Sequence, residues 1–331
     1  MRPTTKLALL IAFTATAVFA QSKPSFEVAT VKPSAPMDQA AMMAALQHGG
    51  KMPFGVDIDN KRAEYRYLDL KTLLTYAYGV KPYQITGPDW MSSTRFDIVA
   101  KLPDGSTKDD APKMLQSLLE ERFALRVHRT TAEHPVLALI PGKGGPKLKP
   151  SAGTPVPIDE SAPLGPGEMR MDGPDGPMRG RVDLTTMSSV LDMGLKGKMA
   201  YKMNPATQSF HIDLMMVTMT GFADMMTQLM TQMGGGTGGR QIVDMTEIKG
   251  NYDAAVEISM AEMMAMARAG GIDTPGAAGG ATGGPATASD PGAGGTSIAD
   301  ALQSMGLKLE SRKAMVEQLI VDHIEKTPTE N

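Results

Sequence analysis

The chain has 331 residues, 42% of them apolar, which is enough to bury one large hydrophobic core or two small ones. Its net charge of -3 gives no electrostatic reason to expect nucleic acid or an anionic membrane as a partner. The absence of cysteine excludes disulfides, a thiol nucleophile and thiolate metal ligands.

The N-terminus has the pattern of a secretory signal peptide over residues 1–20. A basic start that includes Lys6 precedes an apolar run over 7–19, and the small residue Ala20 ends it. The run is shorter than the roughly 20 residues that span a bilayer, and no later segment is a candidate membrane helix. We therefore expect cleavage before Gln21, no membrane span in the mature chain, and a periplasmic or secreted protein.

The first part of the mature chain has the pattern of an α+β module. Asp69 and Gly79 are typical caps at the two ends of a helix, and Pro112 is typical of the first turn of another. A turn at His134-Pro135 is expected to separate the last two strands. Within module 23–140, the expected strands are 26–31, 64–67, 83–85, 95–101, 124–130 and 136–140.

Two later segments are poor in large apolar residues. Residues 141–181 are crowded with proline and glycine, which predicts a long exposed linker. Residues 267–296 are nearly all Gly, Ala, Pro, Thr and Ser, which predicts a disordered insert.

The second module is expected over residues 182–331. Its predicted strands and helices are a strand at 212–217, a helix at 222–233, strands at 241–244 and 252–258, a helix opening at 297–300, and strands at 307–310 and 316–322. The order strand, helix, two strands, helix, two strands repeats that of the first module. The predicted fold class is therefore α+β, with two similar modules joined by Pro/Gly-rich linkers.

The stretches that match a known pattern are 26–34, 73–80, 84–90, 96–101, 114–123 with 128–129, and 302–331. On these residues the chain resembles the soil-associated exported proteins, a domain-of-unknown-function family expanded in Acidobacteria. The resemblance carries no known activity. Related domains occur fused to sensor-type membrane peptidases, and the repeating unit is similar to short periplasmic domains of secretins and TonB-dependent receptors. These likenesses imply an extracytoplasmic binding or sensing role.

The chain departs from this family pattern at one turn. Where the family has Asp-x-Thr-Gly, this chain has Asp244-Met245-Thr246-Glu247. Loss of the glycine is expected to alter the turn.

The histidines do not predict a metal centre. His128 and His134, with Glu133 between them, form the one close pair, whereas a zinc site needs three or four ligands at fixed spacing. His48, His211 and His323 are isolated in the sequence. We expect structural or surface roles for all five and no cofactor.

The 28 methionines allow a second interpretation. Met225, Met226, Met230 and Met233 lie together on one expected helix, and thioethers are ligands for copper(I). Met226 and Met233 also lie on the apolar face of that helix, where methionine is an ordinary core residue. Core packing is the favoured interpretation, and copper(I) binding or a Met-lined groove for a hydrophobic peptide are alternatives.

No catalytic constellation can be selected from the sequence. A Gly-x-Ser-x-Gly elbow is absent, and the glycine run 234–239 lacks the Lys-Ser or Lys-Thr of a phosphate-binding loop. The carboxylate pairs 109–110 and 120–121 fit a helix start and an exposed helix face. No catalytic residue is therefore assigned.

Aromatic residues are densest over 65–90. From this set Tyr76, Tyr78, Tyr83 and Trp90 are the candidate residues for contact with a ligand or partner, because exposed aromatics near turns anchor binding partners. The alternative for Trp90 is a place against the core, since large aromatic side chains are mostly buried.

The leading functional hypothesis is a noncatalytic extracytoplasmic binding or interaction protein, whose partner is an envelope protein or a peptide. The runner-up is an envelope hydrolase with a site that sequence patterns do not reveal. Copper(I) binding is third.

Overall fold

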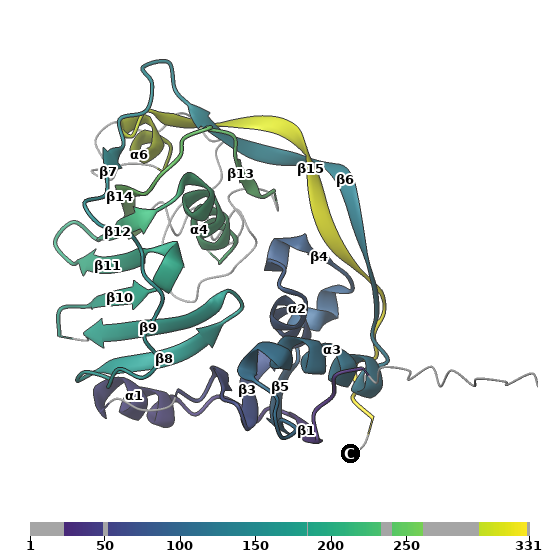
Figure 1. The fold of residues 1–331 in the computed structure, drawn as a ribbon. Coiled ribbons are helices and arrows are strands. Elements are labelled where there is room, and N and C mark those ends of the chain that lie inside the picture. The colour runs from purple at the N-terminus through teal and green to yellow at the C-terminus, as the bar shows by residue number, and fades with distance from the viewer. Residues whose placement is uncertain (1–22, 49–51, 184, 233–239, 261–297, 330–331) are drawn as a thin grey trace, which may run out of the picture.

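A computed structural model describes residues 23–48, 52–183, 185–232, 240–260 and 298–329. The signal peptide predicted over 1–20 and the insert predicted over 267–296 lie outside these residues. The described chain combines helices with three mainly antiparallel sheets, so the fold is α+β (Figure 1).

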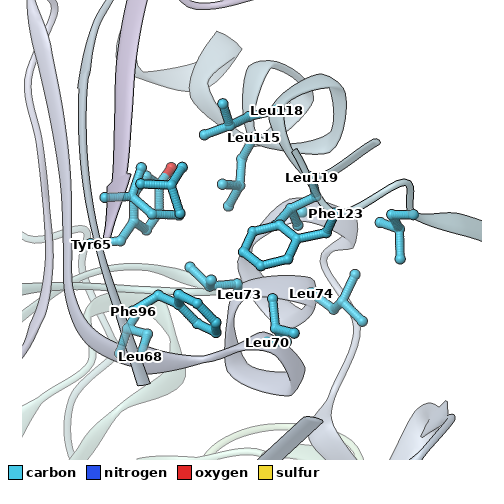
Figure 2. Close-up of a cluster of buried hydrophobic side chains, with 14 of the residues drawn as sticks. Tyr65, Leu68, Leu70, Leu73, Leu74, Phe96, Leu115, Leu118, Leu119 and Phe123 are labelled. Carbon is cyan, nitrogen blue, oxygen red and sulfur yellow. The ribbon is translucent and has the colours of Figure 1, made fainter. Parts of the chain in front are cut away.

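The first sheet has the strand order β1 (Val28–Pro33), β5 (Arg95–Lys101), β3 (Arg62–Asp69) and β2 (Gly55–Ile58), and all its neighbours are antiparallel. Helices α2 (Leu70–Tyr78) and α3 (Ala111–Arg122) share a hydrophobic core with it. Figure 2 shows Phe96 of β5 beside Phe123, which follows α3; their ring centroids lie 5.1 Å apart, edge to face.

The caps predicted for α2 are confirmed. The Asp69 carboxylate accepts a 2.7 Å hydrogen bond from the Thr72 amide, and Gly79 ends the helix with φ of 63°. The strand predicted at 95–101 is also confirmed. The strand predicted at 83–85 is wrong, because a 3-10 turn, η1 (Pro82–Gln84), precedes the two-residue strand β4 (Ile85–Thr86), and a second such turn, η2 (Asp89–Ser92), follows. Helix α1 (Gln39–His48) was not predicted.

The second sheet has seven strands. Their order is β7 (Lys149–Pro150), β14 (Tyr252–Ser259), β12 (Ser209–Val217), β11 (Lys198–Asn204), β10 (Ser188–Asp192), β9 (Gly176–Asp183) and β8 (Glu168–Gly173). Helices α4 (Met219–Gln232) and α6 (Ile298–Ser304) share its core, in which Phe222, Ile258 and Leu302 are buried. A 3-10 turn, η4 (Gly194–Lys196), joins β10 to β11.

The prediction that residues 141–181 form an exposed linker is wrong, because β7, β8 and most of β9 lie within them. The two-residue turn Pro174-Asp175 joins β8 to β9 as a hairpin. Met169 and Met171 alternate with charged residues along β8, which is the pattern of a half-buried strand. The surrounding proline and glycine concealed this pattern.

The third sheet joins the two ends of the molecule. Its order is β13 (Ile242–Asp244), β6 (Arg126–Pro141), β15 (Leu307–His323) and β4. β6 and β15 form a long antiparallel ribbon, which Figure 1 shows running from α6 to α3. β4 lies parallel to β15, and β13 lies parallel to β6. The sheet therefore contains strands from both expected modules.

The breaks predicted in the two ribbon strands are wrong. β6 continues through His134-Pro135, and β15 continues through the residues between 310 and 316. Pro135 pairs with Lys313 of β15 on one side of β6. On the other side, no strand of the described residues pairs with β6 at this position. An edge position tolerates proline, since no neighbour there requires its missing N–H.

A bulge in β3 is held by a side chain of β5. The register of the β3–β5 pair shifts between Tyr65 and Leu68, and Tyr67 has φ of 56°. The Asp97 carboxylate accepts hydrogen bonds of 2.7 Å from both the Tyr67 amide and the Ser34 hydroxyl. These bonds fix the end of β3 just before α2 begins.

A bulge in β12 has the same arrangement. The register of the β12–β14 pair shifts between Leu214 and Val217, and Met216 has φ of 59°. The Asp253 carboxylate accepts hydrogen bonds from the Met216 amide, at 3.1 Å, and the Ser151 hydroxyl, at 2.6 Å. This bulge precedes α4.

Candidate functional site

A pocket of about 240 Å³ lies between the first sheet and the β8–β9 hairpin. One side is formed by Tyr65 of β3, Tyr76 of α2 and Pro112 of α3, and the hairpin supplies the opposite side through Asp172, Pro174 and Pro177. The pocket is therefore built from segments that are more than ninety residues apart in the chain, since Tyr76 and Asp172 differ by 96 positions.

The local sequence explains why both tyrosines reach this pocket. Tyr65 lies on the core side of β3 together with Ala63, and both are buried. Tyr76 lies beside the apolar face of α2, which turns Leu73 and Ala77 into the core. The Tyr65 and Tyr76 ring centroids are 6.3 Å apart, with an angle of 79° between the ring planes.

Hydrogen bonds dock the hairpin against the first sheet. The Tyr76 hydroxyl donates to the backbone carbonyl of Asp172 at 2.9 Å. The Asp172 carboxylate accepts from the backbone amide of Ile58, on β2, at 2.8 Å. Lys108 also lines the pocket and forms an ion pair with Glu160.

Burial dominates the electrostatics of these groups. Burial raises the pKa of the Tyr65 and Tyr76 hydroxyls, and the nearby Asp172 carboxylate raises both further. Burial also raises the pKa of the Asp172 carboxyl. Tyr65 is 1% exposed, and its hydroxyl has no hydrogen-bond partner among the residues that the structure describes. A buried hydroxyl without a protein partner at a pocket wall is available to a ligand.

A charged cluster next to the hairpin turn links three parts of the chain. Asp175, in the turn, contacts Lys81 at 2.5 Å and also pairs with Lys196 of η4. Asp224 of α4 lies 3.8 Å from Lys81 and accepts a 3.0 Å hydrogen bond from the Tyr83 hydroxyl.

The cluster lowers the pKa of two of its members for different reasons. Burial lowers the pKa of Lys196. Although burial alone would raise the pKa of Asp175, hydrogen bonds from Lys196 and Lys81 hold it below its ordinary value. The hairpin turn is therefore held by charge as well as by the hydrogen bonds of Asp172.

The four aromatic residues selected from the sequence lie in two places. Tyr76 and Tyr83 face the second half of the chain, through their hydrogen bonds to Asp172 and Asp224. Tyr78 and Trp90 are partly buried and pack against the first core. Their contact with a ligand or partner stays a prediction for all four.

Sequence reasoning missed two groups that matter at the pocket. Tyr65 lies in the aromatic-rich stretch 65–90 but is not among the four candidate residues, and Asp172 lies in the segment that composition predicted to be a linker. The alternation along β8 and the Gly173-Pro174-Asp175-Gly176 turn were the signals that would have identified the hairpin.

The histidines and acidic residues form no metal centre in the described ranges, where no group of three or more of these side chains could hold an ion. His128 contacts Asp322 at 2.9 Å, His211 contacts Asp213 at 3.1 Å, and His323 contacts Glu325 at 3.0 Å. The side chain of His48 lies outside the described residues.

The methionines of α4 contribute to the second core. Met226 and Met230 are buried beside Phe222, and Met225 is partly buried against the same core. Met233 lies outside the described residues. In the parts of the chain that the structure describes, no helix is both long and apolar enough to cross a membrane.

Comparison with known proteins identifies a family. Residues 71–324 match the family described as Protein of unknown function (DUF3738), so the chain belongs to this family. The match begins in α2 and ends just after β15. No curated protein and no solved structure matches the chain.

Proposed function

We propose that this member of the DUF3738 family is a noncatalytic extracytoplasmic binding protein and that its ligand occupies the pocket between Tyr65, Tyr76 and the β8–β9 hairpin. The observation that carries the proposal is the buried Tyr65 hydroxyl at the pocket wall, which lacks a hydrogen-bond partner among the described residues. Residues 1–20 would direct export, in keeping with the resemblance to the soil-associated exported proteins.

The polar groups around the pocket support binding rather than catalysis. The Asp172 carboxylate is engaged by the Ile58 amide, and the Tyr76 hydroxyl is engaged by the Asp172 carbonyl. Groups held in this way position the hairpin. A general acid or base, in contrast, needs its proton-transferring atom directed at a substrate.

We also propose that the chain contains two copies of one unit. The matching bulges held by Asp97 and Asp253 support this duplication. So does the third sheet, where β4 lies parallel to β15 as β13 does to β6. The sequence Lys-Pro-Ser-Ala also occurs twice, beginning at Lys32 and at Lys149. In each occurrence the Lys-Pro pair lies at the end of an edge strand, β1 or β7.

The duplication gives the hairpin a distinct origin. The first sheet ends at β2, which pairs with β3, whereas the second sheet continues past β11, the strand that pairs with β12, through β10, β9 and β8. These three strands are an extension of the second copy. Their last strand, β8, lies beside β2 of the first copy. The pocket would thus be a feature that neither copy forms alone.

A screen of ligand classes tests this function. Mature protein would be heated with small cations, anions, sugars, neutral amphiphiles and short peptides while its melting temperature is recorded. A ligand that binds the native state raises this temperature. Asp109→Trp, at the exposed rim of the pocket, is designed to block entry, and Asp104→Trp introduces the same side chain at an exposed position outside it.

A ligand that stabilises the wild type and Asp104→Trp but not Asp109→Trp supports the proposal. Equal stabilisation of both variants, or no stabilisation by any class, contradicts the proposed site. Chemical conversion of a ligand bound there contradicts the noncatalytic assignment.

A further inference from the structure

The charges around the pocket leave it acidic. Lys108 is the one basic side chain that lines it, and Lys108 is paired with Glu160. Asp109 and Asp172 also line the pocket and add two carboxylates. A cation that enters would meet this surplus negative charge, whereas an anion would be repelled.

The pocket wall is also poor in donors for an anion. Pro112, Pro174 and Pro177 form much of its wall, and proline has no backbone N–H. Anion sites are instead built from free backbone amides or from unpaired arginine and lysine. The chemistry of the wall therefore favours cations over phosphate-like and carboxylate-like ligands.

Tyr76 adds a second preference. Its ring lies edge to face with the buried Tyr65 ring, and of the two it is the one whose side chain is partly exposed. Aromatic faces attract ammonium groups. A neutral apolar ligand would gain nothing from the nearby Asp172 carboxylate and would bury its charge further without a counter-charge.

The volume limits the size of the ligand. About 240 Å³ lies below the 300–1,000 Å³ that is typical of sites for drug-sized molecules. It suits a head group with a few carbon atoms.

We propose that the pocket binds a small organic cation, a quaternary ammonium or a protonated primary amine, held against the partly exposed ring of Tyr76 and neutralised by the Asp172 carboxylate. The Tyr65 hydroxyl accepts a hydrogen bond from a primary amine or from a water molecule that solvates the ligand. This inference rests on the proposed function, because it names the ligand class of the same site.

Isothermal titration with matched probes tests the inference. The probes are choline, its neutral isostere 3,3-dimethylbutan-1-ol, 1,4-diaminobutane and inorganic phosphate. We expect one molecule of choline or of the diamine to bind, and the neutral isostere to bind at least tenfold more weakly than choline. Binding of the isostere as tightly as choline, or binding of neither cation, overturns the inference.

Variants locate the bound cation. Asp172→Asn retains an oxygen that can accept from the Ile58 amide, so the hairpin stays docked while the charge is removed. We expect this variant to bind the cation at least tenfold more weakly, and Asp104→Trp to bind it as the wild type does. Cation binding that Asp172→Asn leaves unchanged overturns the inference. The wild-type comparison of choline with its isostere does not depend on the stability of any variant.

The two proposals fail in different ways. If phosphate or a neutral ligand binds the wild type and Asp104→Trp but not Asp109→Trp, the pocket is a binding site and the assignment to cations is wrong. If no class of ligand distinguishes Asp109→Trp from Asp104→Trp, the proposed function itself is wrong.

Discussion

Asp97 and Asp253 perform the same task in two different sheets. Each carboxylate accepts one hydrogen bond from a serine hydroxyl and one from the amide of a residue with positive φ in the neighbouring strand. Each fixes a bulge directly ahead of a helix, α2 in one case and α4 in the other. A non-glycine residue in the left-handed region is strained, so these bonds stabilise a conformation that the chain would otherwise avoid.

Replacement of either aspartate should therefore destabilise the protein. We expect Asp97→Ala and Asp253→Ala each to lower the free energy of unfolding by about 1–3 kcal/mol, because each leaves an amide at a bulge without its acceptor. Urea denaturation of the mature protein measures this change. Asp104→Ala, at an exposed loop position, serves as the control. A loss at one aspartate but none at the other would argue that the two bulges are not equivalent.

The turn at Glu247 offers a stabilising substitution. Glu247 has φ of 60° and is exposed. The left-handed conformation costs a non-glycine residue about 1–2 kcal/mol, and glycine removes this cost. Glycine also makes the unfolded chain more flexible, which offsets part of the gain, so Glu247→Gly should stabilise the protein by about 0.5–1 kcal/mol. Glu247→Ala, which keeps the strain, should give no such gain. Equal stability of the two variants would contradict the strain at this turn.

The ion pairs at the hairpin turn predict that the free energy of unfolding falls at acidic pH. Asp175 has a lower pKa in the folded protein than in the unfolded chain, so it stabilises the fold above its unfolded pKa of about 3.9, and this contribution is lost as pH falls through the folded pKa. The difference in free energy of unfolding between wild type and Asp175→Asn should thus be complete near pH 6 and should shrink below about pH 4. We expect a difference of order 1 kcal/mol, since the group is only partly buried.

Denaturation at several pH values measures this difference. High salt should reduce it, because partly exposed ion pairs are screened. A difference that stays constant down to pH 2 would mean that the Asp175 charge contributes nothing.

Export can be tested on the protein itself. Expression of the full chain in a bacterial host should yield, in the periplasm or the medium, a protein whose N-terminus is Gln21. Intact mass and N-terminal sequencing identify the first residue. Recovery of the uncleaved chain from the cytoplasm would contradict the assignment of residues 1–20 as a signal peptide.

The sequence predicted those elements whose signals are local. The helix between Asp69 and Gly79 has a cap at each end, and the strand at 95–101 has clear alternation, so neither depends on distant contacts. The long ribbon could not be predicted in the same way. Pro135 is a turn signal in isolation, and only the open edge beside β6 makes it acceptable within a strand.

The pocket was harder to predict than the fold. Tyr76 could be selected because it is aromatic, but its partner Asp172 lies in a segment that composition assigned to a linker. The pocket arises when strand β8, in the second half of the chain, lies beside β2 in the first. No pattern within either segment specifies that contact, so the site follows only from the assembled sheets.

A crystal structure of the mature protein with choline or 1,4-diaminobutane tests the central claim most directly. The account predicts the cation against the Tyr76 ring, with its nitrogen close to the Asp172 carboxylate. An empty pocket at saturating ligand, or the amine bound at another surface, would contradict it.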